Sequence, residues 1–381
     1  MVGTDIAALS TLQTKAWVAI AVKHERDTSF WFGDNGFMGS GIRDATRPIH
    51  YVDQFTKVLG ADKVVVPLVL PLDGDGRAGD RRLKGNEERL VPDSVEIRID
   101  QLRHGVRNSG RMAELRSILD FAAQAKDALA DWHAQKKDEL AFLTIAGRLY
   151  SLDVTGLVRD PTSNLPLLTY AADVTAPSTN RRVFPQASIT ATTGIAASDK
   201  MTWDTCVRAK AVAIQKRIKP IRMGGKDYYV VVMHAAQSRD MKMTADYKSI
   251  LAQAGEKGNN NPLFRGGFAM VDGLVLFEHM KVPSTFGAAA GAKYGAAGTV
   301  DGAQALLFGA QALGYGSVKG SHDPSMEQES DDYGALAGIE YYQIFGMKKP
   351  VFKSPYDFDA NGDKLTEDFS VISIYTACTP T

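Results

Sequence analysis

Residues 99–112, IDQLRHGVRNSGRM, decide how the chain is read. His104 stands there beside Arg103, Gly105 and Arg107, shortly before Gly110. A catalytic base needs a reacting partner at contact distance and a group that orients it, and the neighbouring sequence names neither. Nucleic-acid sites usually interleave aromatic side chains with their cations, and this stretch contains none. We therefore predict that Arg103, His104 and Arg107 are structural, pairing with carboxylates of the same or a neighbouring subunit.

Upstream of this stretch the sequence predicts a protruding β-loop over about residues 61–110. VVVPLVLPL (64–72) is rich in β-branched residues, and VEIRID (95–100) alternates apolar with charged side chains. The tract between them, DGDGRAGDRRLKGNEER (73–89), is polar and contains four glycines. A connection of this length usually has a function. The tip carries charges of both signs, among them Arg81, Arg82, Lys84, Glu87, Glu88 and Arg89.

Downstream the sequence predicts a long helix, from about Arg111 to Ala146. Small or apolar residues recur every three or four positions, and no proline occurs from Arg111 to Leu165. Such a helix would be ~50 Å long at 1.5 Å per residue. Few enzymes need that length, so we interpret it as a structural spar.

The first 60 residues predict an arm. A short helix is expected at Ile6–Val22, and FWFGDNGFMGSGI (30–42) then alternates glycines with aromatic residues. A segment of this kind buries little against itself. It should therefore pack on the rest of the chain or on another copy.

The remaining sequence divides into a loop-rich stretch and an alternating one. Residues 150–200 contain four prolines, at positions 161, 166, 177 and 185, and predict loops, short strands and an insertion. From Thr202, a candidate N-cap, helices and strands alternate to about residue 345, which predicts one α/β or α+β domain. We expect a helix at 238–254, a strand entered by an Asp-Gly turn at 270–283, and a last strand at 369–377.

Composition argues against several classes of protein. Lys plus Arg total 44 and Asp plus Glu total 44, so there is no cationic excess for a dedicated nucleic-acid binder. Cys206 and Cys378 lie in no metal or redox spacing, which predicts reduced thiols in a protein made in a cytoplasm. The chain start has no signal-peptide pattern and no apolar run could span a bilayer. Common catalytic motifs are absent, so we predict no catalytic residue and no cofactor.

One segment imitates a calcium loop. DFDANGDKLTED (357–368) places acidic or amide residues at the usual positions of such a loop: Asp357, Asp359, Asn361 and Asp368. The twelfth position is usually Glu, however, Pro355 stands where a helix should enter, and a strand pattern follows. Asp, Asn and Gly also favour turns. We therefore predict an ordinary hairpin turn and no metal site.

Several segments together resemble the major capsid proteins of tailed bacteriophages, in the branch of the N-four-like podophages. Besides residues 99–112, they are LKGNEERL (83–90), GGKDYYVVVMH (224–234), NPLFRGGFAMVDGLVLFEHMKVP (261–283), ALLFGAQAL (305–313) and DYGALAGIEYYQIFGMKKPVF (332–352). No single motif is decisive, but their order and coverage, from the arm to about Phe352, make the match strong. Residues 150–200 match weakly.

The resemblance implies an α+β fold of the Hong Kong 97 capsid type. Residues 1–60 would be the N-terminal arm and 61–110 the extended loop that reaches over a neighbour. This role would place the six charged residues of its tip in an intersubunit contact. Residues 111–200 would form the peripheral domain, with its spine helix and an insertion. Residues 201–345 would form the axial domain, and 346–381 would return to the peripheral domain.

The implied function is structural, not enzymatic. Many copies, as pentamers and hexamers, would close an icosahedral shell around double-stranded DNA in a virion, assembled in the cytoplasm of the host bacterium. Portal, scaffolding and decoration proteins are the expected partners. Some relatives carry an N-terminal scaffolding segment, whereas this chain begins at the arm, so scaffolding is expected from another protein or from a part already removed.

Two alternatives remain at this point: an encapsulin-like compartment, and a soluble oligomeric enzyme with an unrecognised site. Neighbouring genes would separate the first from a phage shell. Particle size would separate the second.

Overall fold

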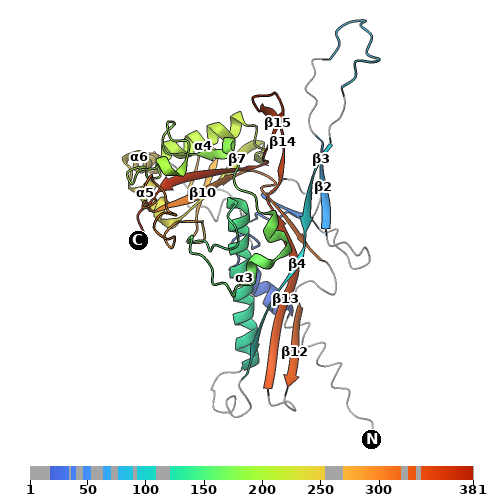
Figure 1. Ribbon diagram of the computed structural model, residues 1–381, viewed down its shortest axis with the longest axis vertical. Helices are drawn as coiled ribbons and strands as arrows, with labels where there is room; N and C mark the ends of the chain where they lie inside the picture. The colour runs from blue at the N-terminus through green and yellow to red at the C-terminus, as the bar shows by residue number, and fades with distance from the viewer. Residues whose placement is uncertain are drawn as a thin grey trace.

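The computed structural model describes residues 18–33, 36–39, 46–52, 63–69, 76–88, 92–108, 121–253, 269–318, 325–331 and 336–380. Figure 1 shows a long upright helix with one sheet beside it, a second sheet covered by helices above, and a narrow loop that projects away from both. The α+β class predicted from the sequence is therefore confirmed.

The long helix is α3, Phe121–Ala146. Its predicted end at Ala146 is confirmed, and the predicted beginning at Arg111 lies outside the described residues. Gly147 ends the helix with φ +67°, a left-handed conformation that favours glycine. A Cβ at this position would also lie 2.2 Å from the carbonyl oxygen of Thr175. Both the backbone conformation and the lack of space therefore require glycine at this position.

The first sheet stands beside α3. Its strands are β1 (Ile49–Val52), β11 (Leu313–Ser317), β13 (Leu336–Lys348), β12 (Ser325–Asp331) and β4 (Asp100–Arg107). β13 pairs antiparallel with β4, β11 and β12, and β1 pairs parallel with β11. Residues 100–107, expected within the projecting loop, therefore belong to the body of the subunit. Leu102 is buried, and residues 100–107 pair with β13 along their whole length, so they form a strand of this sheet.

The second sheet has the order β5-β16-β10-β7-β9-β8, with β6 also on β7. Its strands are β5 (Arg182–Val183), β6 (Ile221–Met223), β7 (Lys226–Met233), β8 (Ala269–Val271), β9 (Leu274–Glu278), β10 (Gly302–Phe308) and β16 (Val371–Ala377). The predicted Asp-Gly turn joins β8 to β9, with φ +50° at Asp272 and +72° at Gly273.

Three helices accompany this sheet: α4 (Trp203–Gln215), α5 (Ala235–Met243) and α6 (Ala245–Gln253). The Thr202 side chain accepts a hydrogen bond from the amide of Thr205, which confirms the predicted N-cap of α4. The single helix expected at 238–254 is in fact two, because Thr244 is extended, with ψ +147°.

The sheets correct two placements. β16 was expected to return to the part that contains the long helix, but it pairs with β10 in the second sheet. β11, β12 and β13 fall in the range expected for the other domain, but they form the first sheet. All seven residues of β16 are buried, which suits a strand covered on both faces. Sequence order alone does not reveal such crossovers.

Residues 150–200 contain loops, as predicted, but in place of the predicted short strands most of their short elements are 3-10 helices: η2 (Leu165–Leu167), η3 (Thr169–Asp173), η4 (Thr179–Arg181) and η5 (Thr192–Gly194), with β5 as a short strand. Tyr170 of η3 joins a core that also contains Phe308 of the second sheet and Phe345 of the first. The two sheets therefore share one continuous apolar core.

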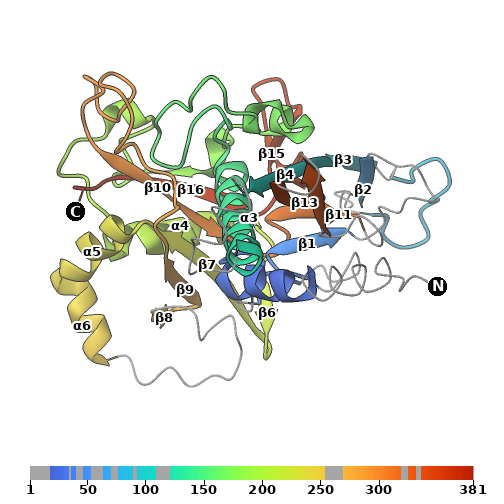
Figure 2. The ribbon, with the colours of Figure 1, turned by 90° about the horizontal axis from the view of Figure 1, so that it is seen from below.

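Two hairpins complete the described chain. β2 (Lys63–Val69) pairs antiparallel with β3 (Pro92–Arg98), and β14 (Val351–Phe358) pairs antiparallel with β15 (Lys364–Asp368). Seen from below, the β2–β3 hairpin and its loop extend sideways from the first sheet (Figure 2).

Candidate assembly surface

The β2–β3 hairpin carries the predicted polar loop. At its base Val64 and Ile97 are buried in a small cluster with Val52 and Val318. The described tip, residues 76–88, is exposed at every position, including Leu83 at 58%. Figure 1 shows this tip well away from the rest of the subunit. The loop is therefore built on the core at one end and fully presented to solvent at the other.

The tip is ordered by contacts within itself. The amide of Asn86 donates to the carbonyl oxygen of Leu83 at 2.8 Å, and the amide of Gly85 donates to a Glu87 carboxylate oxygen at 2.6 Å. Within the described part of the chain, the side chains of Arg81 and Lys84 have no ion-pair partner. The same holds there for Arg82, whereas Arg89 lies outside the described residues.

The charged stretch at the base of the loop is split between two faces of β4. Alternate residues of a strand point to opposite faces, so Arg103 and Arg107 share one face and His104 lies on the other. Arg103 pairs with Glu340 of β13 at 3.7 Å, within its own subunit. His104 stacks on Trp132 of α3, with ring centroids 4.3 Å apart and planes at 25°. The three residues therefore do not form one site.

The calcium-like segment forms the predicted turn between β14 and β15. An Asp359 carboxylate oxygen accepts hydrogen bonds from the amides of Asn361 and Asp363, each at 2.8 Å. Gly362 has φ +85°. Asp357 and Asp368 lie away from this turn and face cations. Among the described residues no group of three His, Cys, Asp or Glu side chains is placed to hold a metal ion.

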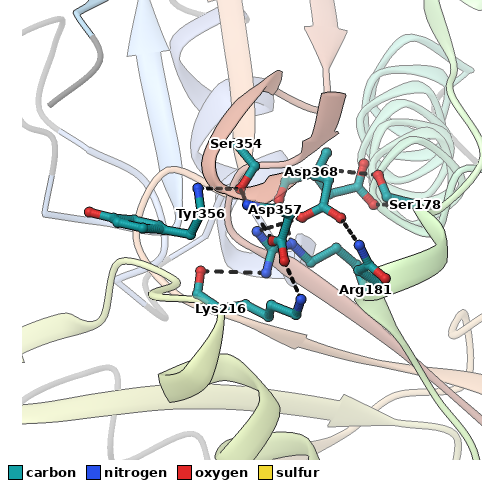
Figure 3. A network of polar contacts seen from close by, with 9 residues as sticks. Ser178, Arg181, Lys216, Ser354, Tyr356, Asp357 and Asp368 are labelled. Carbon is teal, nitrogen blue, oxygen red and sulfur yellow. Dashed lines mark hydrogen bonds and ion pairs between the residues drawn. The ribbon is translucent and has the colours of Figure 1, made fainter. Parts of the chain in front are cut away.

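A polar cluster at the base of this hairpin joins four segments of the chain (Figure 3). Lys216, just after α4, donates to Asp357 of β14. Arg181 of η4 pairs with Glu367 of β15 at 3.1 Å and donates to the carbonyl oxygen of Asp368 at 3.2 Å. Asp368 also pairs with Lys349 at 2.9 Å, both almost fully buried.

Two carboxyl groups in this cluster, those of Asp357 and Glu367, affect each other's pKa. Burial, and then the contact with Asp357, raise the pKa of Glu367. Burial opposes ionisation of Asp357 as well, but its contacts with Lys216, Glu367 and Ser354 together outweigh burial and lower the pKa of Asp357. The two pKa values are therefore displaced in opposite directions, upward for Glu367 and downward for Asp357.

A second cluster, which the sequence did not predict, fixes the arm to α3. Residues 18–28 are helical, so the predicted arm helix is present and extends beyond Val22, while its first part lies outside the described residues. In this helix Glu25 contacts Lys137 at 3.0 Å and accepts from the Tyr341 hydroxyl at 2.6 Å. Burial opposes its charge, but Lys137 and His133 hold the pKa of Glu25 well below its usual range.

The next turn of the arm is held by Asp138. Its carboxylate accepts hydrogen bonds from the Ser29 hydroxyl at 2.7 Å and from the amides of Phe30 and Trp31 at 2.7 and 3.2 Å. Burial raises the pKa of Asp138 despite these contacts. The arm therefore packs on its own subunit. The signal in the sequence was the pair of charges, Lys137 and Asp138, on the side of α3 that becomes buried.

A family model described as phage capsid protein matches residues 5–379. The chain belongs to this family. As a phage capsid protein it has a structural, shell-forming role and is a component of the virion. The major capsid protein of Pseudomonas phage KPP25 is 38% identical to it over 384 residues, covering 98% of this chain and 97% of that protein.

Solved capsids have the same fold as this capsid protein. The capsid of Ralstonia phage GP4 has a TM-score of 0.74 and 26% identity, covering 93% of this chain and 92% of that one. The capsid of Cyanophage Pam1 has a TM-score of 0.62 and 18% identity, covering 84% and 86%. The predicted Hong Kong 97-type capsid fold is thereby confirmed. In the described ranges each helix of the capsid protein is too short or too polar to cross a membrane.

Proposed function

We propose that this protein is the major capsid protein of a tailed bacteriophage. Copies arranged as pentamers and hexamers close an icosahedral shell around double-stranded DNA, which the shell holds without sequence-specific contacts. Membership of the capsid family and the likeness to a relative named a major capsid protein support this. The absence of net charge is compatible with it, because a strongly cationic wall would retain the genome through phosphate contacts.

In this proposal the parts of the subunit have separate roles. Residues 1–60 are the arm, whose strand β1 joins the first sheet, and the β2–β3 hairpin with its tip is the extended loop. α3 with the first sheet is the peripheral domain. The second sheet with α4, α5 and α6 is the axial domain, which surrounds the five- and six-fold centres. Portal, scaffolding and decoration proteins are the proposed partners, assembly takes place in the host cytoplasm, and no step requires catalysis or a cofactor.

The observation that carries the proposal is the exposed tip of the β2–β3 loop. It carries charges of both signs and contributes nothing to the core of its own subunit. We propose that it clasps a neighbour through Arg81, Arg82, Lys84, Glu87, Glu88 and Arg89, and that Arg103, His104 and Arg107 lie near the same interface. One exposed ion pair contributes only about 0–1 kcal/mol, but the contact recurs on every subunit of a closed shell. Charge complementarity also selects the correct register.

Reversal of the tip carboxylates tests this role. The double variant Glu87→Lys and Glu88→Lys should leave circular dichroism and the melting of the unassembled subunit unchanged, because both side chains are exposed. Shell yield, counted by negative-stain microscopy, should fall sharply. The neutral pair Glu87→Gln and Glu88→Gln should be intermediate, and high salt should act on wild-type assembly in the same direction.

Two results would count against the proposal. Normal shell yield from the double reversal would remove the loop from the assembly contacts. Sedimentation of the wild-type protein as monomer under all salt and concentration conditions would contradict the shell itself.

A further inference from the structure

The β2–β3 loop leaves the subunit through a bend that is held from one side. Arg98, at the end of β3, lies 4.0 Å from the Asp173 carboxylate of η3. Two residues later Asp100 accepts a hydrogen bond from the amide of Thr169 at 2.7 Å. The Thr169 hydroxyl donates to the carbonyl oxygen of Ile99 at 3.2 Å. These contacts fix where the loop begins but not the direction of its outer part.

A second contact lies further out along β3. There the Asp93 carboxylate accepts a hydrogen bond from the backbone amide of Lys353, on β14, at 2.9 Å. Phe352 also faces the loop, across a cavity of about 50 Å³ whose lining includes Val66 and Val95. Figure 1 shows the β14–β15 hairpin standing beside β3. The hairpin therefore supports the loop close to the point where it leaves the body.

The hairpin is itself anchored on its other side by the polar cluster of Figure 3. Asp357 is bound by Lys216, and Glu367 is bound by Arg181 and by the Asn180 side chain at 2.6 Å. These segments come from the end of α4 and from η4, neither of which belongs to either hairpin. These contacts connect η4 and the end of α4 to the β14–β15 hairpin, and the hairpin in turn contacts β3.

Charged groups are an unusual way to attach a hairpin if stability alone is required. Desolvating buried ions costs about as much as their attraction returns, so apolar side chains of the same size would serve stability as well. Charges with fixed hydrogen-bond partners instead favour one geometry over its alternatives. Such a cluster suits a part whose position matters.

We infer that the β14–β15 hairpin is a brace that sets the direction of the β2–β3 loop, with Asp93, Asp357 and Glu367 as its positioning residues. The loop direction is a property of one subunit. Its consequence for shells rests on the proposed assembly role of the tip.

The direction of the loop can be measured in the full-length chain with spin labels at Leu83→Cys, on the tip, and Asp127→Cys, on the exposed side of α3. Cys206 and Cys378 are buried, and labelling of the unmodified chain measures their background. Labelled chains are diluted into unlabelled ones, so that only distances within one subunit contribute. The wild-type arrangement should give a narrow distance distribution.

Asp93→Ala removes the acceptor for Lys353 and should broaden that distribution. Asp93→Asn keeps an oxygen acceptor at the same place and should restore the narrow one. Glu367→Ala should broaden the distribution too, while Glu367→Gln, which keeps an oxygen acceptor for the Asn180 side chain, should not. Asp363→Ala removes an exposed carboxylate from the same hairpin outside the cluster, and it should behave as wild type.

A wild-type distribution in both Asp93→Ala and Glu367→Ala would overturn the brace. So would a broadening that Asp363→Ala produces equally. If Glu367→Ala fails to fold, the comparison of Asp93→Ala with Asp93→Asn decides the question. Shell yield of the same variants separates the two proposals: a broad distribution with normal yield upholds the brace and contradicts the assembly role of the loop, whereas an unchanged distribution with lost yield does the reverse.

Discussion

Truncation of Trp31 tests whether the arm is part of its own subunit's core. The side chain is fully buried and its ring lies 5.0 Å from that of Phe142, 5.2 Å from Phe308 and 5.5 Å from Phe37. A Trp side chain buries about 150–250 Å², which at about 25 cal/mol per Å² corresponds to about 4–6 kcal/mol. Measured losses for Trp→Ala in cores are about 3–5 kcal/mol. We expect Trp31→Ala to lower the free energy of unfolding by that amount.

The measurement is urea unfolding of the unassembled subunit at several protein concentrations, with Leu83→Ala at the exposed tip as the matched control. Surface substitutions of this kind change stability by about 0.5 kcal/mol or less. An arm packed on its own subunit gives a loss that is independent of protein concentration. A loss below about 1 kcal/mol, or one that grows with concentration because copies exchange their arms, would refute the assignment of the arm to its own core.

Three further outcomes follow from contacts described above. Glu367 has a raised pKa in the folded state, so its protonated form stabilises the fold below the unfolded pKa of 4.5, and this stabilisation is lost as pH rises through the folded pKa. Glu367→Gln cannot titrate and should therefore flatten the pH–stability curve between the unfolded and folded pKa values. A Cβ on Gly346 would lie 1.8 Å from the Arg98 carbonyl oxygen, so Gly346→Ala should cost about 1–3 kcal/mol in thermal unfolding, whereas Gly338→Ala on the same strand, with 3.8 Å of space, should be nearly neutral. Asp359→Ala should cost about 1 kcal/mol through its two lost amide hydrogen bonds, equally with and without chelator; a cost that chelator abolishes would restore the calcium hypothesis.

The features predicted from the sequence are those with local causes. The Thr202 cap, the Asp272–Gly273 turn and the β2–β3 alternation each depend on a few neighbouring residues. The strand that contains His104 was not predicted, because its partner on β13 is more than 200 residues away in the chain, with His104 opposite Tyr341. The alternation found in the sequence covers residues 95–100, and nothing local decides whether the residues after it continue a loop or enter a sheet.

In the candidate site, too, features with local causes could be predicted and features that depend on long-range contacts could not. The charged tip could be identified from composition. Residues 73–89 contain one large apolar side chain, Leu83, so they could not form part of a core and were expected to be exposed. The brace could not be identified in this way, since Asp93 and Lys353 meet only after the two halves of the chain have folded together. The ion pair between Glu25 and Lys137 joins residues 112 positions apart. The sequence gave one indication of this contact, the charged residues Lys137 and Asp138 on a helix face that is buried.

The pairing of β1 with β11 affects the order of events during synthesis. β1 lies parallel to β11, with Ile49 opposite Leu313, so the first described strand pairs with a strand made more than 200 residues later. An open edge is a template for pairing with other chains, and a shell protein accumulates in many copies. While the chain is on the ribosome, residues 49–52 have no β11 partner strand until residue 316 has emerged. A nascent chain therefore cannot complete this sheet until β13 has also emerged, and its unpaired strands stay open to other chains for most of translation.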